Sequence, residues 1–147
     1  MLTKLSPDQL SEHWPMVYRA IKSSSIALAE MTEDKINNVL RSLMSGHATC
    51  WINQKNNAIT TVLVTTITEE PISRTLNLLI YSAHMFLKCK PEEYLEMAKD
   101  LGSYARSVYC SRVIVYCSND KITEVFKNNG ALSLFTLVVF PVLKIST

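Results

Sequence analysis

Apolar side chains recur three or four positions apart near the start of the chain, which is the spacing of one face of a helix. The first such stretch begins at residues 6–9 (Ser-Pro-Asp-Gln), a capping box with proline at the first helical position, and runs to about Lys22. A second stretch follows Thr32 and stops at Gly46, because glycine readily adopts the left-handed conformation that ends many helices. This part of the chain therefore predicts two helices.

Alternation of apolar and polar residues replaces the helical spacing after the second helix and predicts β-strands. Residues 47–53 and 58–68 flank a polar turn at 54–57 and form a predicted hairpin. The third strand of this group, at residues 74–86, is longer. These strands are consecutive, so we expect them to pair as an antiparallel meander.

Helical spacing and strand patterns alternate in the remainder of the chain. A helix is predicted from Pro91 to about residue 108, and a short apolar strand at 112–117. Asn119 then caps a helix that ends at the Asn-Asn-Gly of residues 128–130, and a last strand is predicted at 132–143. The predicted order is β-α-α-β-β-β-α-β-α-β, an α/β (α+β) fold with a mixed sheet in a single domain that covers residues 1–147.

Composition and charge exclude several classes of protein. The 147 residues carry 15 Lys and Arg against 13 Asp and Glu, and no basic run is longer than two, so we expect no nucleic-acid partner. The longest apolar run, at 131–143, is interrupted by polar residues and is too short to cross a bilayer. The first residues contain no apolar signal core. We therefore expect a soluble protein with no membrane partner.

Cysteines and glycines limit the chemistry further. The four cysteines lack Cys-x-x-Cys spacing, and we expect free, buried thiols and no metal site, since no second pair of ligands completes a zinc site. The glycines are Gly46, Gly102 and Gly130, and no two lie close together. This spacing excludes the glycine-rich loops with which P-loop and dinucleotide-binding proteins hold phosphates.

One stretch towards the C-terminus resembles the GNAT-type acetyltransferases. Residues 104–131 read as a helix that ends near Ala-Arg, a strand, and then the family's Asn-x6-Tyr-x3-Gly-Phe element. Asn119 and Gly130 match the Asn and the Gly of this element, whereas Phe126 stands at its Tyr position and Ala131 at its Phe position. The predicted order of elements resembles the family over the whole chain. A capped helix ended by glycine also occurs in other α/β proteins, so the motif is moderately specific.

The resemblance implies a site for acetyl-CoA, but the segment that would hold the pyrophosphate departs from the family pattern. The family has Arg/Gln-x-x-Gly-x-Gly/Ala between its fourth strand and third helix, where backbone amides approach the phosphates closely. Residues 81–91 of this chain contain no glycine and include a bulky apolar run. The candidate cofactor-binding residues are Lys88 and Lys90, which precede a helix N-terminus, and Asn119; the alternative is that they are solvated surface residues.

The resemblance also implies a general acid and a general base. In active relatives the tyrosine at the position of Phe126 commonly donates a proton to the departing thiolate, and phenylalanine has no proton to donate. Tyr116 or Tyr109 could replace it, with ordinary packing as the alternative. The predicted strand at 74–86 contains no carboxylate to act as a base, whereas His84 could accept a proton if it is exposed. The candidate catalytic residues are therefore His84 and Tyr116.

These departures favour a GNAT-like domain that has lost catalysis. We expect a structural or protein-interaction subunit of a larger assembly, which acts through protein partners or self-assembly and needs no cofactor. Diverged proteins of this kind are familiar among tailed-phage gene products, so the resemblance implies a virion component if the protein is phage-encoded, and otherwise a cytoplasmic protein. The alternative is an active N-acetyltransferase that uses acetyl-CoA and an amine.

Overall fold

The computed structural model describes residues 1–24, 29–117, 120–134 and 138–139. The chain divides into two units, Met1–Tyr116 and Cys117–Thr147, and each is described by itself. That residues 1–147 form a single domain stays a prediction.

A five-stranded mixed sheet forms the middle of the first unit, in the order β1-β2-β3-β4-β5. The strands are β1 (Thr3–Lys4), β2 (Ala48–Lys55), β3 (Ala58–Glu69), β4 (Leu76–Met85) and β5 (Arg112–Val115). Strands β1 to β4 are antiparallel to their neighbours, and β5 runs parallel to β4. The predicted mixed α+β fold, an antiparallel meander followed by a strand–helix–strand crossover, is confirmed.

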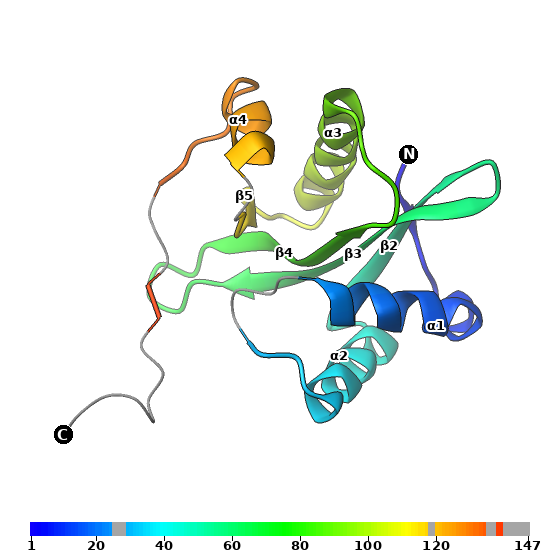
Figure 1. Cartoon of the computed structure of the whole chain (residues 1–147). Helices are drawn as coiled ribbons and strands as arrows, with labels where there is room; N and C mark the ends of the chain where they lie inside the picture. Colours follow the sequence, from blue (N-terminus) through cyan, green and yellow to red (C-terminus); the bar gives the residue numbers. More distant parts are fainter. Residues whose placement is uncertain (25–28, 118–119, 135–137, 140–147) are drawn as a thin grey trace. The chain divides into compact units, whose positions relative to one another are not determined.

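Helices α1 (Pro7–Ser23) and α2 (Glu33–Ser45) cover one face of this sheet (Figure 1). Both predicted helices are confirmed together with their caps. The capping box at the start of α1 is formed, because the Gln9 backbone N–H donates to Ser6 Oγ and the Ser6 N–H donates to Gln9 Oε1. Gly46 ends α2 at a φ of 84°.

The core on this face, which we call the first core cluster, contains aliphatic side chains from both helices and from β2 and β3. Each aliphatic side chain that is fully buried stabilises the fold by about 1.5–3 kcal/mol. The fully buried members of the cluster include Val17, Ile21, Ile36, Val62 and Val64.

Helix α3 (Pro91–Ser107) lies on the opposite face of the sheet (Figure 1). The second core cluster forms there, between α3 and the strands, and includes Trp51, Leu63, Leu78, Met97 and Leu101. Two helices on one face and one on the other leave both surfaces of strands β2 to β4 buried over much of their length. This explains why the strands contain long apolar stretches in addition to simple alternation.

The hairpin turn is shorter than the sequence predicts. Strand β2 extends to Lys55, and the turn consists of Asn56 and Asn57, with φ values of 53° and 64°. Asparagine tolerates this left-handed region better than other non-glycine residues, so two residues are enough to join the strands. The predicted turn at 54–57 is therefore wrong. Its first two residues belong to the end of β2, where exposed polar side chains resemble the residues of a turn.

The second unit contains helix α4 (Asp120–Lys127), followed by a turn that ends at Gly130 with a φ of 100°. This helix confirms the prediction, although its predicted cap, Asn119, lies outside the described residues. The last predicted strand, 132–143, is not seen in the part of it that the structure describes. Residues 132–134 and 138–139 are exposed and pair with no strand among the described residues.

The cysteines are free, as predicted, but they differ in exposure. Cys50 and Cys89 are buried, Cys110 is half-buried and Cys117 is exposed. Burial raises the pKa of the Cys50 thiol to about 12. None of the helices in the described part of the chain is long and apolar enough to cross a bilayer.

Candidate functional site

Strand β5 pairs with only the first half of β4. The pairing runs from Asn77 opposite Arg112 to Ile80 opposite Val115. Beyond that point, residues 81–85 of β4 have no strand beside them on that edge among the described residues. We call the place where the two strands separate the fork. It leaves this edge of β4 without a neighbouring strand among the described residues.

A β-bulge lies at the fork. Residues 80 and 82 of β4 stand opposite consecutive residues of β3, so Tyr81 has no position opposite it. A bulge bends its strand and redirects side chains. The Tyr81 ring packs against the first core cluster, and partial burial raises the pKa of its phenol, which therefore stays protonated at neutral pH.

Tyr116 lies at the other branch of the fork. It follows Val115, the last paired residue of β5, just as Tyr81 follows Ile80 on β4. The Tyr116 side chain is 36% exposed. The parallel register therefore brings two tyrosines to the two branches of the fork, and one of them is a residue that the sequence analysis selected as a candidate general acid.

The segment between β4 and α3 is where the resemblance would place a cofactor's pyrophosphate. Its bulky apolar run does not fill the segment: Met85 packs against the second core cluster, Phe86 against the first, and Leu87 is 59% exposed. The backbone amides of residues 87–90 donate no hydrogen bond within the described part of the chain. Backbone amides without a partner, just before the start of a helix, can bind an anion even where no glycine is present.

Charges around this segment are mixed, with a small excess of lysine. Lys88 and Lys90 are exposed, and Lys90 is the N-cap residue of α3 without a side-chain cap hydrogen bond. Of the two glutamates in the first turn of α3, Glu93 forms an ion pair with Lys55 at 3.5 Å between Nζ and Oε1. This pair neutralises one of the two carboxylates that would repel a phosphate.

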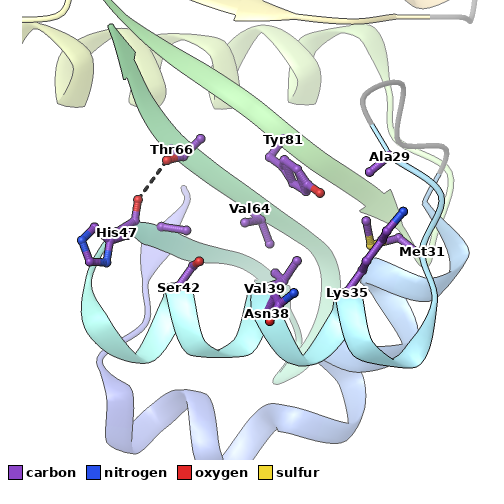
Figure 2. Close-up of a pocket in the computed structure, with 11 residues that line it drawn as sticks. Ala29, Met31, Lys35, Asn38, Val39, Ser42, His47, Val64, Thr66 and Tyr81 are labelled. Atoms are coloured by element: carbon purple, nitrogen blue, oxygen red, sulfur yellow. Dashed lines mark hydrogen bonds between the residues drawn. The ribbon is translucent and has the colours of Figure 1, made fainter. Parts of the chain in front are cut away.

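A pocket of about 340 Å³ lies on the α1/α2 face of the sheet (Figure 2). One wall is a single face of α2, and the others come from β2, β3, β4 and the residues that precede α2. Figure 2 shows Tyr81 extending from β4 and Lys35 from α2 into this space. The polar residues that line the pocket are Lys35, Asn38, Ser42, His47, Thr66 and Tyr81.

Of the other predicted site residues in the first unit, His84 and Tyr109 do not line the pocket. His84 is half-buried further along β4, with its ring edge-on to Phe86 at 4.7 Å between centroids. Phe126 belongs to α4 in the second unit, and Asn119 lies outside the described residues. Tyr109 is 87% exposed after the end of α3. The roles assigned to these residues stay predictions.

The sequence analysis missed the bulge and the pocket. Nothing in the local pattern around Tyr81 marks a bulge, because the bulge is defined by pairing with β3. Lys35 carries no signal either, since a lysine on an amphipathic helix is ordinarily a solvated residue. As for metals, the described residues contain no group of three or more histidine, cysteine or acidic side chains that could hold an ion.

Comparison of the sequence with models of protein families finds no match, and comparison with curated proteins finds none either. Solved structures are similar in fold at low sequence identity. An aminoglycoside acetyltransferase from an uncultured soil sample has a TM-score of 0.69 at 11% identity, over 96% of this chain and 93% of that one. A GNAT family acetyltransferase of Staphylococcus aureus has a TM-score of 0.67 at 10% identity, over 97% and 98%. A ribosomal-protein-alanine N-acetyltransferase of Brucella melitensis has 0.63 at 8% identity, over 96% and 99%. The fold of this chain is therefore GNAT-like.

These neighbours overturn the expectation of a non-catalytic assembly subunit. The solved structures that resemble this chain include several acetyltransferases, and these favour the catalytic alternative. The expectation that leaned against an enzyme finds no support among these structures. The expected phage, virion and structural roles find none either. The predicted protein partners, the predicted lack of a nucleic-acid partner and the cytoplasmic location stay predictions.

Proposed function

We propose that the protein is an N-acetyltransferase that transfers the acetyl group of acetyl-CoA to an amine. The observation that carries this proposal is the likeness to acetyltransferase structures over 95–97% of the chain. Fold likeness is a weak guide to chemistry when it stands alone. The fork, the amides before α3 that have no hydrogen-bond acceptor in the described part of the chain, and the pocket at Tyr81 add a candidate site to the fold.

The residues before α3 fit the phosphates of acetyl-CoA. Amides of residues 87–90 would donate to the pyrophosphate, and the N-terminal end of the α3 dipole would add to the attraction. Lys88 and Lys90 would supply positive charge. As in the resembling family, the fork would admit the pantetheine arm and bring the thioester beside Tyr81 and Tyr116. Acetyl-CoA supplies an activated acyl group when bound.

The reaction requires the amine nitrogen to form a bond to the acetyl carbon while the carbon–sulfur bond breaks. The amine loses a proton, and the departing thiolate takes one to leave as the CoA thiol. Tyr81 and Tyr116 lie at the two branches of the fork, so either could donate that proton in place of Phe126. His84 is the candidate to accept the amine proton, directly or through water.

The test is an incubation of the full chain with acetyl-CoA and a panel of amines, in which mass spectrometry follows both CoA and the acetylated amine. A thiol reagent is unsuitable, because the exposed Cys117 would also react. We expect stoichiometric CoA and acetylated product. If no amine is acetylated and calorimetry detects no binding of acetyl-CoA at millimolar concentration, the proposal fails.

Variants identify the proton donor. Loss of a general acid lowers kcat by about 10²–10⁴-fold, so either Tyr116→Phe or Tyr81→Phe should show a loss of this size. Tyr109→Phe tests the remaining candidate tyrosine, and we expect no loss there, since Tyr109 precedes β5 and its side chain is 87% exposed. Unchanged kcat in both fork variants would remove tyrosine from this role without affecting the proposed reaction.

A further inference from the structure

The pocket under α2 carries a positive charge that the fold leaves uncompensated. Among its lining residues there is no aspartate or glutamate, and Lys35 is the residue with a permanent charge. The Lys35 ammonium makes no ion pair within the described part of the chain. Its backbone N–H donates to Thr32 Oγ1, which fixes Lys35 in the first turn of α2. Among the described residues that line the pocket, Lys35 is therefore the charged side chain, and it is exposed to solvent.

Neutral donors lie along the same wall. Asn38 Oδ1 accepts a hydrogen bond from Arg41 Nη1 at 3.0 Å, which directs the Asn38 amide and leaves its N–H groups to donate. The Nδ1 atom of His47 shares a hydrogen bond with Ser45 Oγ at 2.6 Å, so Nε2 is left for a ligand. Lys35 at the start of α2 can bind a carboxylate or a phosphate group, and the Asn38 amide lies one turn further along the same helix, whereas His47 lies beyond its other end.

This arrangement constrains the amine that the enzyme accepts. An ammonium group alone would be repelled by Lys35, whereas an amine that also carries an anionic group would be attracted and oriented. The pocket's volume of about 340 Å³ is near the lower end for small-molecule sites, so a compact substrate fits it. With its anionic group at Lys35, such a molecule would extend its amine across the pocket towards Tyr81 at the fork.

From these features we infer that the acceptor is a small amine that carries a carboxylate or phosphate group, which Lys35 binds in the pocket between α2 and the sheet. The inference rests on the proposed function, because the substrate's amine, held near Tyr81, can meet the acetyl group only if the fork holds acetyl-CoA. It adds the substrate class and a specificity-determining residue, which the fold likeness does not supply.

Binding can be tested without turnover, by calorimetry with matched probes. The first pair is β-alanine and its amide, and the second is aminoethyl phosphate and ethanolamine. In each pair the first member has the anionic group and the second lacks it. We expect tighter binding of the anionic member. A hydrogen bond to a charged group contributes about 1.5–3 kcal/mol, which corresponds to about 10–150-fold in the dissociation constant.

Variants of Lys35 separate charge from shape. Lys35→Gln should remove the preference for the anionic member of each pair, and Lys35→Arg should retain it. Lys99→Gln is the control, because it removes the same charge from the exposed surface of α3, on the opposite face of the sheet. In turnover, Lys35→Gln should raise KM for anionic amines by about ten-fold or more, with little change in kcat.

The outcomes distinguish the inference from the proposed function. Equal binding within each pair, a preference that survives in Lys35→Gln, or no binding of either anionic probe would overturn the inference. Efficient acetylation of the neutral amines alone would overturn it as well, and would leave the proposed function intact. Tight binding of the anionic probes with no acetylation of any amine would instead contradict the proposed function.

Discussion

Individual polar side chains inside the sheet have specific partners, and this is the scale at which single substitutions act. Thr65 is fully buried on β3, and its Oγ1 accepts a hydrogen bond from Trp51 Nε1 at 2.9 Å. Thr61 is equally buried on the same strand, but its hydroxyl contacts only the Cys89 sulfur, at 3.9 Å. The two threonines therefore differ mainly in the strength of their hydrogen bond.

Replacing Thr65 with valine keeps the shape and removes the acceptor. The Trp51 indole N–H would then be buried without a partner, which costs about 1–3 kcal/mol. Thr61→Val is the control and should cost less than about 1 kcal/mol, because a weak sulfur contact is all that it removes. Urea denaturation of both variants measures the difference. Equal losses would show that the indole hydrogen bond contributes nothing specific.

The C-terminal end of α3 holds a tyrosine in a backbone conformation that this residue type does not favour. The Cys110 N–H donates to the Ala105 carbonyl and the Tyr109 N–H donates to the Arg106 carbonyl, which together form a Schellman motif. The residue in the left-handed position of this motif is usually glycine, but here it is Tyr109, at a φ of 63°. A bulky residue in this region is strained.

Tyr109→Gly should therefore stabilise the protein, by about 1 kcal/mol, since glycine adopts this conformation without the clash of a Cβ atom. The Tyr109 side chain is 87% exposed, so its removal loses little packing. Tyr109→Ala provides the comparison, because it removes the ring and keeps the strained Cβ. Thermal or urea denaturation should rank Gly above Tyr and Ala. A variant with glycine that is no more stable than the one with alanine would exclude backbone strain at this position.

The first unit as a whole places two proposed binding regions next to β4, one in the segment that follows the strand and one on the α1/α2 face of the sheet. The amides of residues 87–90 precede α3, whereas the pocket with Lys35 lies on the α1/α2 face. Of the two regions, the pocket includes Tyr81 at the fork. The strands between them belong to both core clusters, so the two faces of the sheet depend on the same backbone.

Local patterns predicted the elements of this unit, because caps such as residues 6–9 and Gly46 act within one turn of chain. The site depends on pairing across long separations. The fork begins where the pairing of β4 with β5 stops, after Ile80 opposite Val115. No local sequence pattern predicts that position. The bulky apolar run at 85–87 suggested that this segment could not hold a phosphate. Its side chains instead divide between the two core clusters and solvent. This distribution also depends on contacts that are distant in the sequence.

A shared sheet predicts that acetyl-CoA stabilises both faces together. At a concentration 100 times its dissociation constant, a ligand raises the free energy of unfolding by about 2.7 kcal/mol. Trp14 packs beside the first core cluster and Trp51 lies in the second, so Trp51→Phe and Trp14→Phe leave one reporter on each face. In each variant we expect acetyl-CoA to shift the fluorescence and far-ultraviolet circular dichroism transitions equally. A shift seen only by Trp51 would mean that the α3 face binds the cofactor and unfolds separately from the pocket side.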